Sequence, residues 1–164
     1  MDFLVKPCKK QDTPFLWEML YQSIYVADGD QPLSKDVLKH PSIEKYLKNW
    51  GEEKGDYALM AVRTDGTPIG AIWIRKFKKD DAGYGFVDEE TPELGMAICL
   101  PYRGKGIGRK LLSKMSSHAR SFGYQALSLS VSADNFPAIL LYETSGFKKV
   151  SEDDGGSWIM QKVL

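Results

Sequence analysis

A glycine-rich segment, RGKGIG at residues 103–108, carries the clearest chemical signal in the sequence. It lies between a stretch predicted to be a strand and an amphipathic stretch predicted to be a helix. The first turn of a helix leaves backbone N–H groups unpaired and carries a partial positive charge. Glycines let those N–H groups approach a ligand, because no Cβ stands in the way. The segment therefore predicts a binding site for a phosphorylated anion.

The charges around this segment favour the same prediction. Residues 101–120 contain six basic side chains and no acidic one, namely Arg103, Lys105, Arg109, Lys110, Lys114 and Arg120. The alternative is a tight turn followed by a solvated basic helix face. Hydrogen bonds to a charged group contribute about 1.5–3 kcal/mol each, so several together could hold a pyrophosphate.

Two other phosphate-binding motifs do not fit this spacing. A nucleoside-triphosphate loop requires G-x-x-x-x-G-K-S/T, and no glycine here precedes such a Lys-Ser/Thr pair. A dinucleotide fingerprint, G-x-G-x-x-G, would need glycine where Arg109 stands. About 60 residues remain downstream, too few for the other strands of that fold.

The segment resembles motif A of the GNAT superfamily of N-acetyltransferases, Q/R-x-x-G-x-G/A, through Arg103, Gly106 and Gly108. Residues 93–100, followed by Pro-Tyr, resemble the fourth strand of that family. Residues 127–131, Asn135, the LLYE sequence at 140–143 and the Gly-Phe pair at 146–147 resemble motif B. The resemblance is specific over about 93–150, whereas residues 1–92 agree only in the order of their elements.

The resemblance implies a mixed α/β domain, with a largely antiparallel central sheet flanked by helices, whose fourth and fifth strands splay apart. It implies acetyl-CoA or a related acyl-CoA as the ligand, with pantetheine in the gap between those strands. The residues implied for cofactor binding are Ile98, Cys99 and Leu100 for pantetheine, Arg103, Gly104, Lys105, Gly106, Ile107 and Gly108 for pyrophosphate, Arg109 and Lys110 nearby, Asn135 for the pantetheine arm, and Tyr142 facing the thioester sulfur.

Acyl transfer to an amine requires a neutral amine. An amine with a pKa near 10.4 is neutral in only about one molecule in 10^3.4 at pH 7, which costs roughly 4.6 kcal/mol without help. A general base is therefore valuable. Glu93 is the candidate, because it opens the predicted fourth strand, near where acceptors enter in the resembling family. Glu90, Glu89 and Asp88 are alternatives, and Glu93 could equally be a solvated strand-end carboxylate.

The leaving thiolate also needs a proton. Tyr142 is the general-acid candidate, because a phenol with a pKa near 10 stays neutral at pH 7. Its alternative role is that of a buried aromatic side chain. A backbone N–H of the fourth strand, that of Ile98, would polarise the thioester carbonyl. Cys99 is read as a spectator thiol, since no histidine neighbours it, and the lone His40 and His118 predict no metal site or triad.

The acceptor site has weaker signals. Residues 80–93 contain six acidic side chains and no basic one, so they could attract a cationic amine or simply form a solvated loop. Trp73 and Arg75 could line the pocket, and Trp17, Tyr21 and Tyr25 could wall it. These aromatic residues are more commonly part of a core.

Hydrophobic periodicity predicts the elements that must position these residues. Strands are expected over 3–7, 57–63, 68–77, 93–100, 126–131, 147–151 and 158–163, and helices over 14–25, 42–50, 106–122 and 137–144. An Asp-Gly pair at 65–66 predicts a hairpin. No linker divides the chain, so residues 1–164 are expected to form one domain.

Composition limits the remaining choices. The chain has 164 residues, and 22 basic side chains balance 22 acidic ones, which argues against a general nucleic-acid or membrane-surface binder. Cys8 and Cys99 are expected to be free thiols, and the N-terminal residues lack the apolar region of a secretory signal. A cytoplasmic location follows as an expectation.

The expected function is transfer of an acetyl group from acetyl-CoA to a primary amine of a small molecule or peptide, by direct attack in a ternary complex, without a metal. The expected partners are acetyl-CoA and a cationic amine. A non-catalytic acyl-CoA sensor is the alternative, and O-acyl transfer is not excluded. The acceptor, the acyl chain length and the choice between monomer and homodimer stay open.

Overall fold

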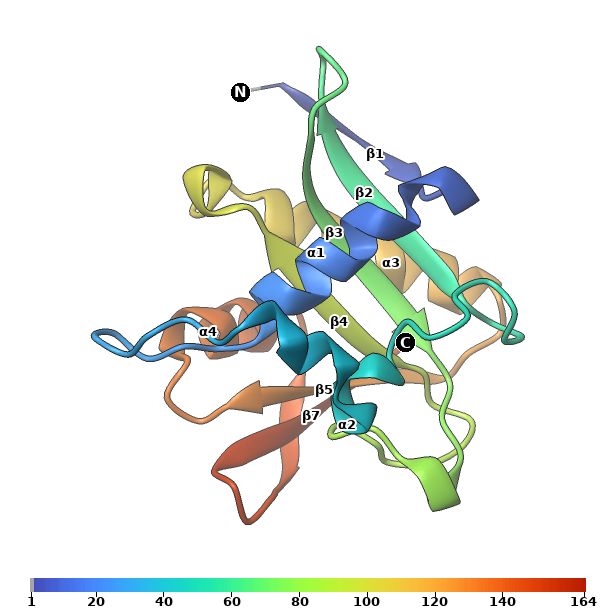
Figure 1. Ribbon diagram of the computed structural model, residues 1–164. Coiled ribbons are helices and arrows are strands. Elements are labelled where there is room, and N and C mark those ends of the chain that lie inside the picture. The colour runs from blue at the N-terminus through green and yellow to red at the C-terminus, as the bar shows by residue number, and fades with distance from the viewer. Residues whose placement is uncertain (1) are drawn as a thin grey trace.

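A seven-stranded sheet forms the centre of the computed structural model, which describes residues 2–164 (Figure 1). Its strand order is β1-β2-β3-β4-β5-β7-β6. The strands are β1 Phe3–Pro7, β2 Tyr57–Arg63, β3 Pro68–Arg75, β4 Glu93–Ile98, β5 Ala126–Ser132, β6 Lys148–Glu152 and β7 Ser157–Val163. All neighbouring pairs are antiparallel except β4 and β5. The expected mixed α/β class is confirmed.

Helices cover both faces of the sheet. They are α1 Thr13–Ser23, α2 Pro41–Glu44, α3 Ile107–Ser121 and α4 Phe136–Thr144. Short 3-10 segments lie at Lys10–Asp12, Lys35–Lys39, Lys79–Asp81 and Leu100–Tyr102. The α1 helix packs on one face, across β3 and β4, and α3 packs on the other (Figure 1).

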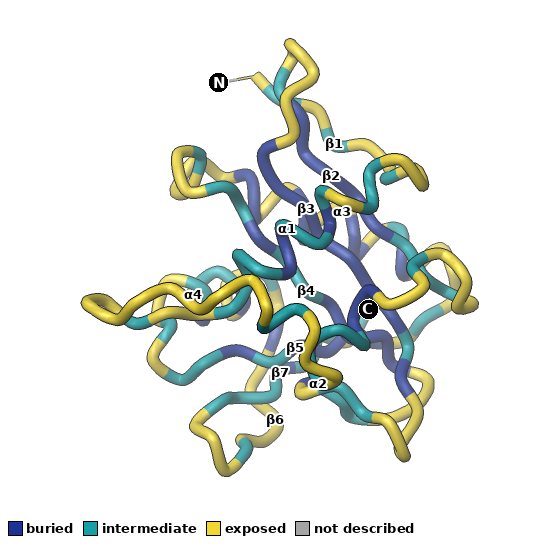
Figure 2. Tube along the Cα trace, in the orientation of Figure 1, coloured by how far each residue is buried: buried dark blue, intermediate teal, exposed yellow. Residues whose placement is uncertain are grey.

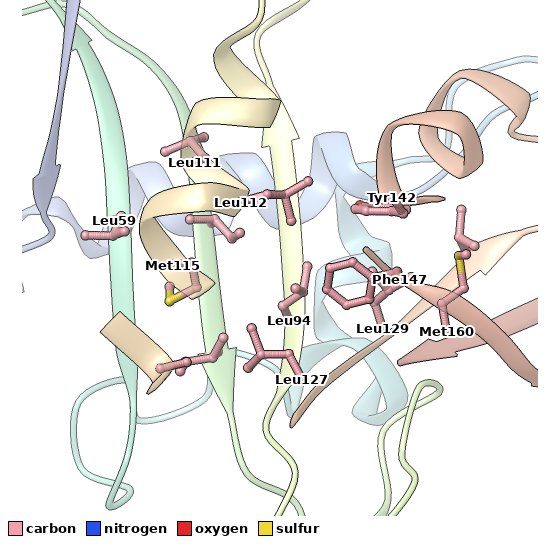
Figure 3. Close-up of a cluster of buried hydrophobic side chains, with 14 of the residues drawn as sticks. Leu59, Leu94, Leu111, Leu112, Met115, Leu127, Leu129, Tyr142, Phe147 and Met160 are labelled. Atoms are coloured by element: carbon pink, nitrogen blue, oxygen red, sulfur yellow. The ribbon is translucent and has the colours of Figure 1, made fainter. Parts of the chain in front are cut away.

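Each face has its own apolar core, because the central strands are buried on both sides (Figure 2). On the α3 side, Leu111, Leu112 and Met115 face Leu94 and Leu127 of the sheet (Figure 3). On the α1 side, the core includes Leu16, Met19, Leu47 and Trp73. The apolar residues of α3 lie on one face of the helix, and their spacing in the sequence predicted this helix.

The sheet opens between its two central strands. β4 and β5 pair only at Glu93 and Ser128, where the Ser128 N–H donates to the Pro92 carbonyl at 3.0 Å. Beyond this point the two strands separate, so the expected splay is present. The gap divides the sheet into β1–β4 and β5-β7-β6, which the core around α3 and α4 holds together.

Most predicted element ranges agree with the structure to within two residues at each end, and two of the differences concern segments near the site. The helix expected over 42–50 is a four-residue α2 followed by turns. The fourth strand ends at Ile98, because Pro101 introduces a 3-10 turn after Cys99. Within residues 2–164, no helix is both long and apolar enough to span a bilayer.

Candidate functional site

The glycine turn leads directly into α3. Gly104 and Gly106 have φ angles of 76° and 84°, in the left-handed region that glycine adopts without strain. Gly106 is the N-cap of α3 and provides no capping side chain, so the N–H groups of the first helical turn have no side-chain cap. The turn is exposed, with Arg103 and Lys105 beside it. These are the properties of an anion-binding helix start.

Gly108 has a different structural reason for being glycine. It is buried, and an added Cβ would lie 2.9 Å from Cδ2 of Leu141 on α4. The first turn of α3 therefore packs closely against α4. This contact fixes the turn relative to Asn135 and Tyr142, which lie at the start and toward the end of α4.

The free edge of β4 faces the splay. The Cys99 N–H donates to the Ile69 carbonyl at 2.9 Å, and the Cys99 carbonyl accepts from Tyr102. Because successive residues of a strand alternate their hydrogen-bonding direction, Ile98 and Met96 direct their N–H groups the opposite way, toward β5. The Ile98 carbonyl already accepts from Arg103 Nε at 2.8 Å. The N–H and carbonyl groups of Cys99 are therefore both hydrogen-bonded within the protein, whereas the N–H groups of Met96 and Ile98 face the gap between β4 and β5.

Tyr142 lies on the α3 side of the sheet, with its ring packed edge-on against Phe147 at 5.8 Å (Figure 3). Its hydroxyl makes no hydrogen bond to another residue in the part of the chain that the structure describes. Burial raises the pKa of Tyr142 to about 12. The phenol is therefore neutral at physiological pH and can act as a donor.

Asn135 begins α4, and its Oδ1 accepts weakly from the Ala138 N–H at 3.4 Å. The side-chain NH2 group is left for a ligand. Asp134, next to it, accepts a hydrogen bond from the Tyr25 hydroxyl through its carbonyl, at 3.3 Å. This contact brings the segment after α1 alongside the start of α4, as Figure 1 shows.

Glu93 lies on the opposite, α1 side of the sheet, and only 3% of its surface is exposed. Its Oε2 accepts a hydrogen bond of 2.5 Å from the Tyr46 hydroxyl. Oε1 makes no hydrogen bond of normal geometry within the described residues. Burial raises the pKa of Glu93 to about 7, while Tyr46, the Gly85 N–H and Lys45 act in the opposite direction with smaller effects. Glu93 is thus a buried carboxyl group that titrates near neutrality.

A loop covers this carboxylate. An added Cβ at Gly83 would collide with Glu93 Oε1, and one at Gly85 would lie 2.5 Å from the Leu129 main chain. Both glycines let the loop lie against the sheet over Glu93 and β5. The Tyr84 N–H donates to the Tyr46 hydroxyl at 2.8 Å, which ties the loop to the same tyrosine that binds Glu93.

The acidic residues of this loop have local roles. Asp81 forms an ion pair with Lys45 at 2.8 Å, the Asp88 carboxylate accepts from the Glu90 N–H, and Glu89 accepts from the Lys79 N–H. Arg75 does not line a pocket, because it forms a buried ion pair with Asp56 at 2.8 Å. The other acidic alternatives to Glu93 are exposed, which distinguishes Glu93 from them.

Trp73 is fully buried on the same face as Glu93. Its indole ring lies over Gly95 of β4, where an added Cβ would come within 2.5 Å of the ring. Its Nε1 has no partner within the described residues. A side chain at position 95 would therefore displace the indole.

Tyr21 of α1 lies beside an exposed lysine from the following segment. Lys35 donates to Glu18 Oε2 at 2.7 Å, and its ammonium lies 5.4 Å from the centre of the Tyr21 ring. The side chains of Lys35 and Glu18 are both exposed, so this is a surface ion pair.

The remaining reactive residues form no further catalytic constellation. Burial raises the pKa of the Cys99 thiol, which favours its neutral, unreactive form. His40 accepts from the Ser42 N–H, and His118 lies against Tyr57. No group of three or more potential His, Cys, Asp or Glu metal ligands occurs within residues 2–164.

Sequence reasoning did not identify Tyr46 or Gly83. Tyr46 lies 47 residues before Glu93, in a predicted helix that the structure shows as turns. No motif in the sequence marks Tyr46. Gly83 lies among the acidic residues of 80–93, and its contact with Glu93 follows from tertiary packing alone.

The fold, the glycine turn and the splayed strands together define an acyltransferase architecture. The family model described as "Acetyltransferase (GNAT) family" matches residues 17–147. The chain belongs to the GNAT acetyltransferase family.

Individual relatives agree with this assignment. An uncharacterized N-acetyltransferase, YycN of Bacillus subtilis, is 32% identical over 69% of this chain and 82% of its own length. A mycothiol acetyltransferase of Propionibacterium freudenreichii is 32% identical over 68% of this chain but only 33% of its own length. A spermine/spermidine N(1)-acetyltransferase of B. subtilis is 29% identical over 66% of this chain and 60% of its own length. The chain thus spans about a third of the mycothiol enzyme.

The structural comparison extends over the whole chain. A GNAT-family acetyltransferase of Staphylococcus aureus Mu50 superposes with a TM-score of 0.72, covering 99% of both chains at 17% sequence identity. This likeness shows the shared fold.

Proposed function

We propose that this protein is an N-acetyltransferase that transfers the acetyl group of acetyl-CoA to a cationic primary amine by direct attack in a ternary complex. The supporting observation is the position of two ionisable groups on opposite sides of the β4–β5 splay. Glu93 lies on the α1 face, and Tyr142 lies on the α3 face. A thioester held between them would have a base on the acceptor side and a donor on the thiol side.

The cofactor binds in this proposal through main-chain groups. The pyrophosphate lies on the turn 103–108 and the first N–H groups of α3, with Arg103, Lys105, Arg109 and Lys110 adding positive charge. Pantetheine occupies the splay beside Asn135. The free N–H groups of β4, at Met96 or Ile98, polarise the thioester carbonyl and stabilise the oxyanion of the tetrahedral intermediate.

Glu93 acts as the general base through an intervening water molecule. A carboxylate with a pKa about 2.5 units above the usual value accepts a proton more favourably by about 3 kcal/mol. Proton transfer from an amine with a pKa near 10.4 therefore costs about 4.6 kcal/mol, compared with about 8 kcal/mol for transfer to a carboxylate with the usual pKa of 4.5. Ionised Glu93 also attracts a cationic acceptor before the reaction.

Tyr142 completes the reaction at the sulfur atom. Because its pKa is about 12, full proton transfer to the thiolate is uphill, and its main contribution is a hydrogen bond to the developing negative charge. The neutral amine attacks the carbonyl carbon and forms the C–N bond, and the C–S bond then breaks. The first proton lost by nitrogen goes to Glu93, and the second goes to the leaving thiolate, which Tyr142 holds by a hydrogen bond.

The experiment that tests this function is a thiol-release assay with acetyl-CoA and a panel of amines. The panel contains spermidine, spermine, small monoamines and lysine-bearing peptides, with alcohols as O-acyl acceptors. We expect turnover with at least one cationic amine and an amide product by mass spectrometry. Tight CoA binding with no turnover on any acceptor would instead identify a sensor.

A further inference from the structure

A polar groove lies between α3, the end of α4 and β7, and shares only Arg109 with the site described above. Its volume is about 300 Å³. Three cationic side chains line it, namely Arg109, Arg120 and Lys162, and the remaining lining groups are hydroxyls. Arg109 directly follows the glycine turn, whereas Arg120 lies three turns further along α3, so the groove extends well beyond the helix start.

The positive charge in this groove is not neutralised by protein. No acidic side chain lines it. Within residues 2–164, none of the three cations takes part in an ion pair. Burial and the neighbouring Arg120 both lower the pKa of Lys162, and no carboxylate counteracts them. An anion in the groove would relieve this repulsion.

Specific contacts hold two of the three cations, Lys162 and Arg109, in place. The stem of Lys162 passes over Gly146, whose φ of 101° suits glycine, and an added Cβ there would approach Lys162 Cε to 3.3 Å. Lys162 Nζ then donates to Ser116 Oγ at 3.0 Å, and Ser116 is only 3% exposed. Arg109 Nη2 donates to Thr144 Oγ1 at 3.2 Å. Lys162 and Arg109 are therefore preorganised, and the exposed Arg120 lies beside them in the lining of the groove.

An unpaired donor completes the groove. Ser145 lines it, and its Oγ is buried without a hydrogen-bond partner among the described residues. A buried hydroxyl without a partner is costly unless a ligand or water satisfies it. Ser145 and Ser116 can both donate to an oxyanion, because hydroxyl groups rotate to suit their partner.

We infer that this groove binds a phosphate group through Lys162, Arg120 and Arg109, assisted by the Ser116 and Ser145 hydroxyls. This inference goes beyond the proposed acyl transfer, because it assigns an anion site remote from the thioester. The phosphate could be a free ion or the 3′-phosphate of a CoA molecule whose pyrophosphate lies on the turn 103–108. Both sources present the same chemistry to the groove.

The test compares wild type with Lys162→Met and Arg120→Gln. Lys114→Met is the matched control, because Lys114 is an exposed lysine on α3 outside the groove. Phosphate affinity is measured from the thermal shift, with sodium chloride at matched ionic strength as reference. Affinities for CoA and dephospho-CoA are measured by calorimetry. Melting without ligand verifies folding, which Lys162→Met should preserve because it removes a half-buried charge.

We expect Lys162→Met and Arg120→Gln each to weaken the phosphate interaction at least about tenfold, while Lys114→Met leaves it unchanged. If the source is CoA, wild type prefers CoA over dephospho-CoA by at least about tenfold, and Lys162→Met abolishes that preference. If the source is free phosphate, the variants differ from wild type in the thermal shift caused by phosphate, but not in their preference between CoA and dephospho-CoA. The inference is overturned if both measurements are the same in wild type and both groove variants. Failure of CoA to bind at all would contradict the proposed function, while the phosphate arm would still report on the groove.

Discussion

The Tyr46 hydroxyl donates a hydrogen bond to Oε2 of Glu93 and accepts one from the Tyr84 N–H. One phenol group therefore connects the buried carboxylate to the loop that covers it. The hydrogen bond stabilises the ionised form of Glu93 and partly opposes the effect of burial. The pKa of the proposed base thus depends on a residue that precedes it by 47 positions.

Replacing Glu93 with Gln should remove the acidic limb of the pH–rate profile. In wild type, kcat/KM should rise with pH toward an apparent pKa near 7, since Glu93 must be ionised to accept a proton. In Glu93→Gln, kcat should fall by about 10²-fold or more. Steady-state assays from pH 5 to 9 measure both effects. Glu89→Gln is the control, and equal pH profiles for wild type and Glu93→Gln would remove Glu93 from the mechanism.

Although Glu93→Gln should lower activity, it should raise the free energy of unfolding relative to wild type at neutral and higher pH. The folded-state pKa of Glu93 lies above its usual value of 4.5, so the native state retains a proton that the unfolded chain has lost. The free energy of unfolding of wild type therefore falls as pH rises from about 4.5 to 7. Relative to wild type, Glu93→Gln should gain about 3 kcal/mol between pH 4 and pH 8. Urea unfolding at the two pH values measures the difference, and a pH-independent difference would contradict it.

Replacing Tyr46 with Phe should shift the apparent pKa of Glu93 upward. The lost hydrogen bond stabilised the carboxylate, and its loss corresponds to about one pKa unit. The acidic limb of kcat/KM should move to higher pH without disappearing. Tyr84→Phe is the control, because the Tyr84 hydroxyl donates to Ser42 Oγ, whereas the contact with Tyr46 is made by the Tyr84 main-chain N–H, which the substitution retains. An unshifted limb in Tyr46→Phe would separate Tyr46 from the base.

Replacing Tyr142 with Phe should lower kcat by about 10²-fold while leaving the dissociation constant of CoA nearly unchanged. The ring would still pack against Phe147, so the fold should be retained. Because the pKa of Tyr142 is about 12, wild type should show no loss of activity from ionisation of this residue up to pH 10. Single-turnover rates and CoA titrations test this, and an unchanged kcat would leave Tyr142 with a packing role.

Replacing Gly106 with Ala should weaken CoA binding about tenfold or more, because its φ of 84° is strained for alanine and the turn must relax. Gly66→Ala is a matched control, since Gly66 has a φ of 91° in the β2–β3 hairpin and an equally open surrounding. Both variants should lose about 1–2 kcal/mol of stability. Calorimetry measures the CoA affinity of both variants, and only Gly106→Ala should show a loss. Equal CoA affinity in the two variants would mean that the pyrophosphate binds elsewhere.

The parts of the fold that follow local rules could be predicted from sequence. The Asp65-Gly66 pair forms the expected hairpin, and the spacing of apolar residues between Ile107 and Ala119 correctly predicted α3. The predicted helix over 42–50 was wrong after Glu44, because Tyr46 and Leu47 are buried from turns rather than from a regular helix. Tertiary packing decided that conformation.

The site shows the same division. The glycine turn was visible because its backbone conformation requires particular residues. The burial of Glu93 was not visible, because it depends on Gly83 and Tyr46, which reach it from separate segments. From sequence alone, a carboxylate at a strand end is expected to be exposed to solvent. Only the tertiary structure shows that a loop covers it. Its altered pKa is therefore a property of the assembled tertiary structure.

Because β4 and β5 separate, β4 has unpaired backbone N–H and C=O groups like those of an edge strand, although it lies in the middle of the sheet. After the single bridge at Glu93 and Ser128, β4 has one satisfied edge against β3 and one edge without a neighbouring strand. A molecule that lies along that edge can complete the sheet with its own amides, and it would then be held by the polypeptide's repeating pattern rather than by particular side chains. Extensive side-chain replacement around the opening is compatible with such attachment, provided that the bridge and the separation of the two strands are retained.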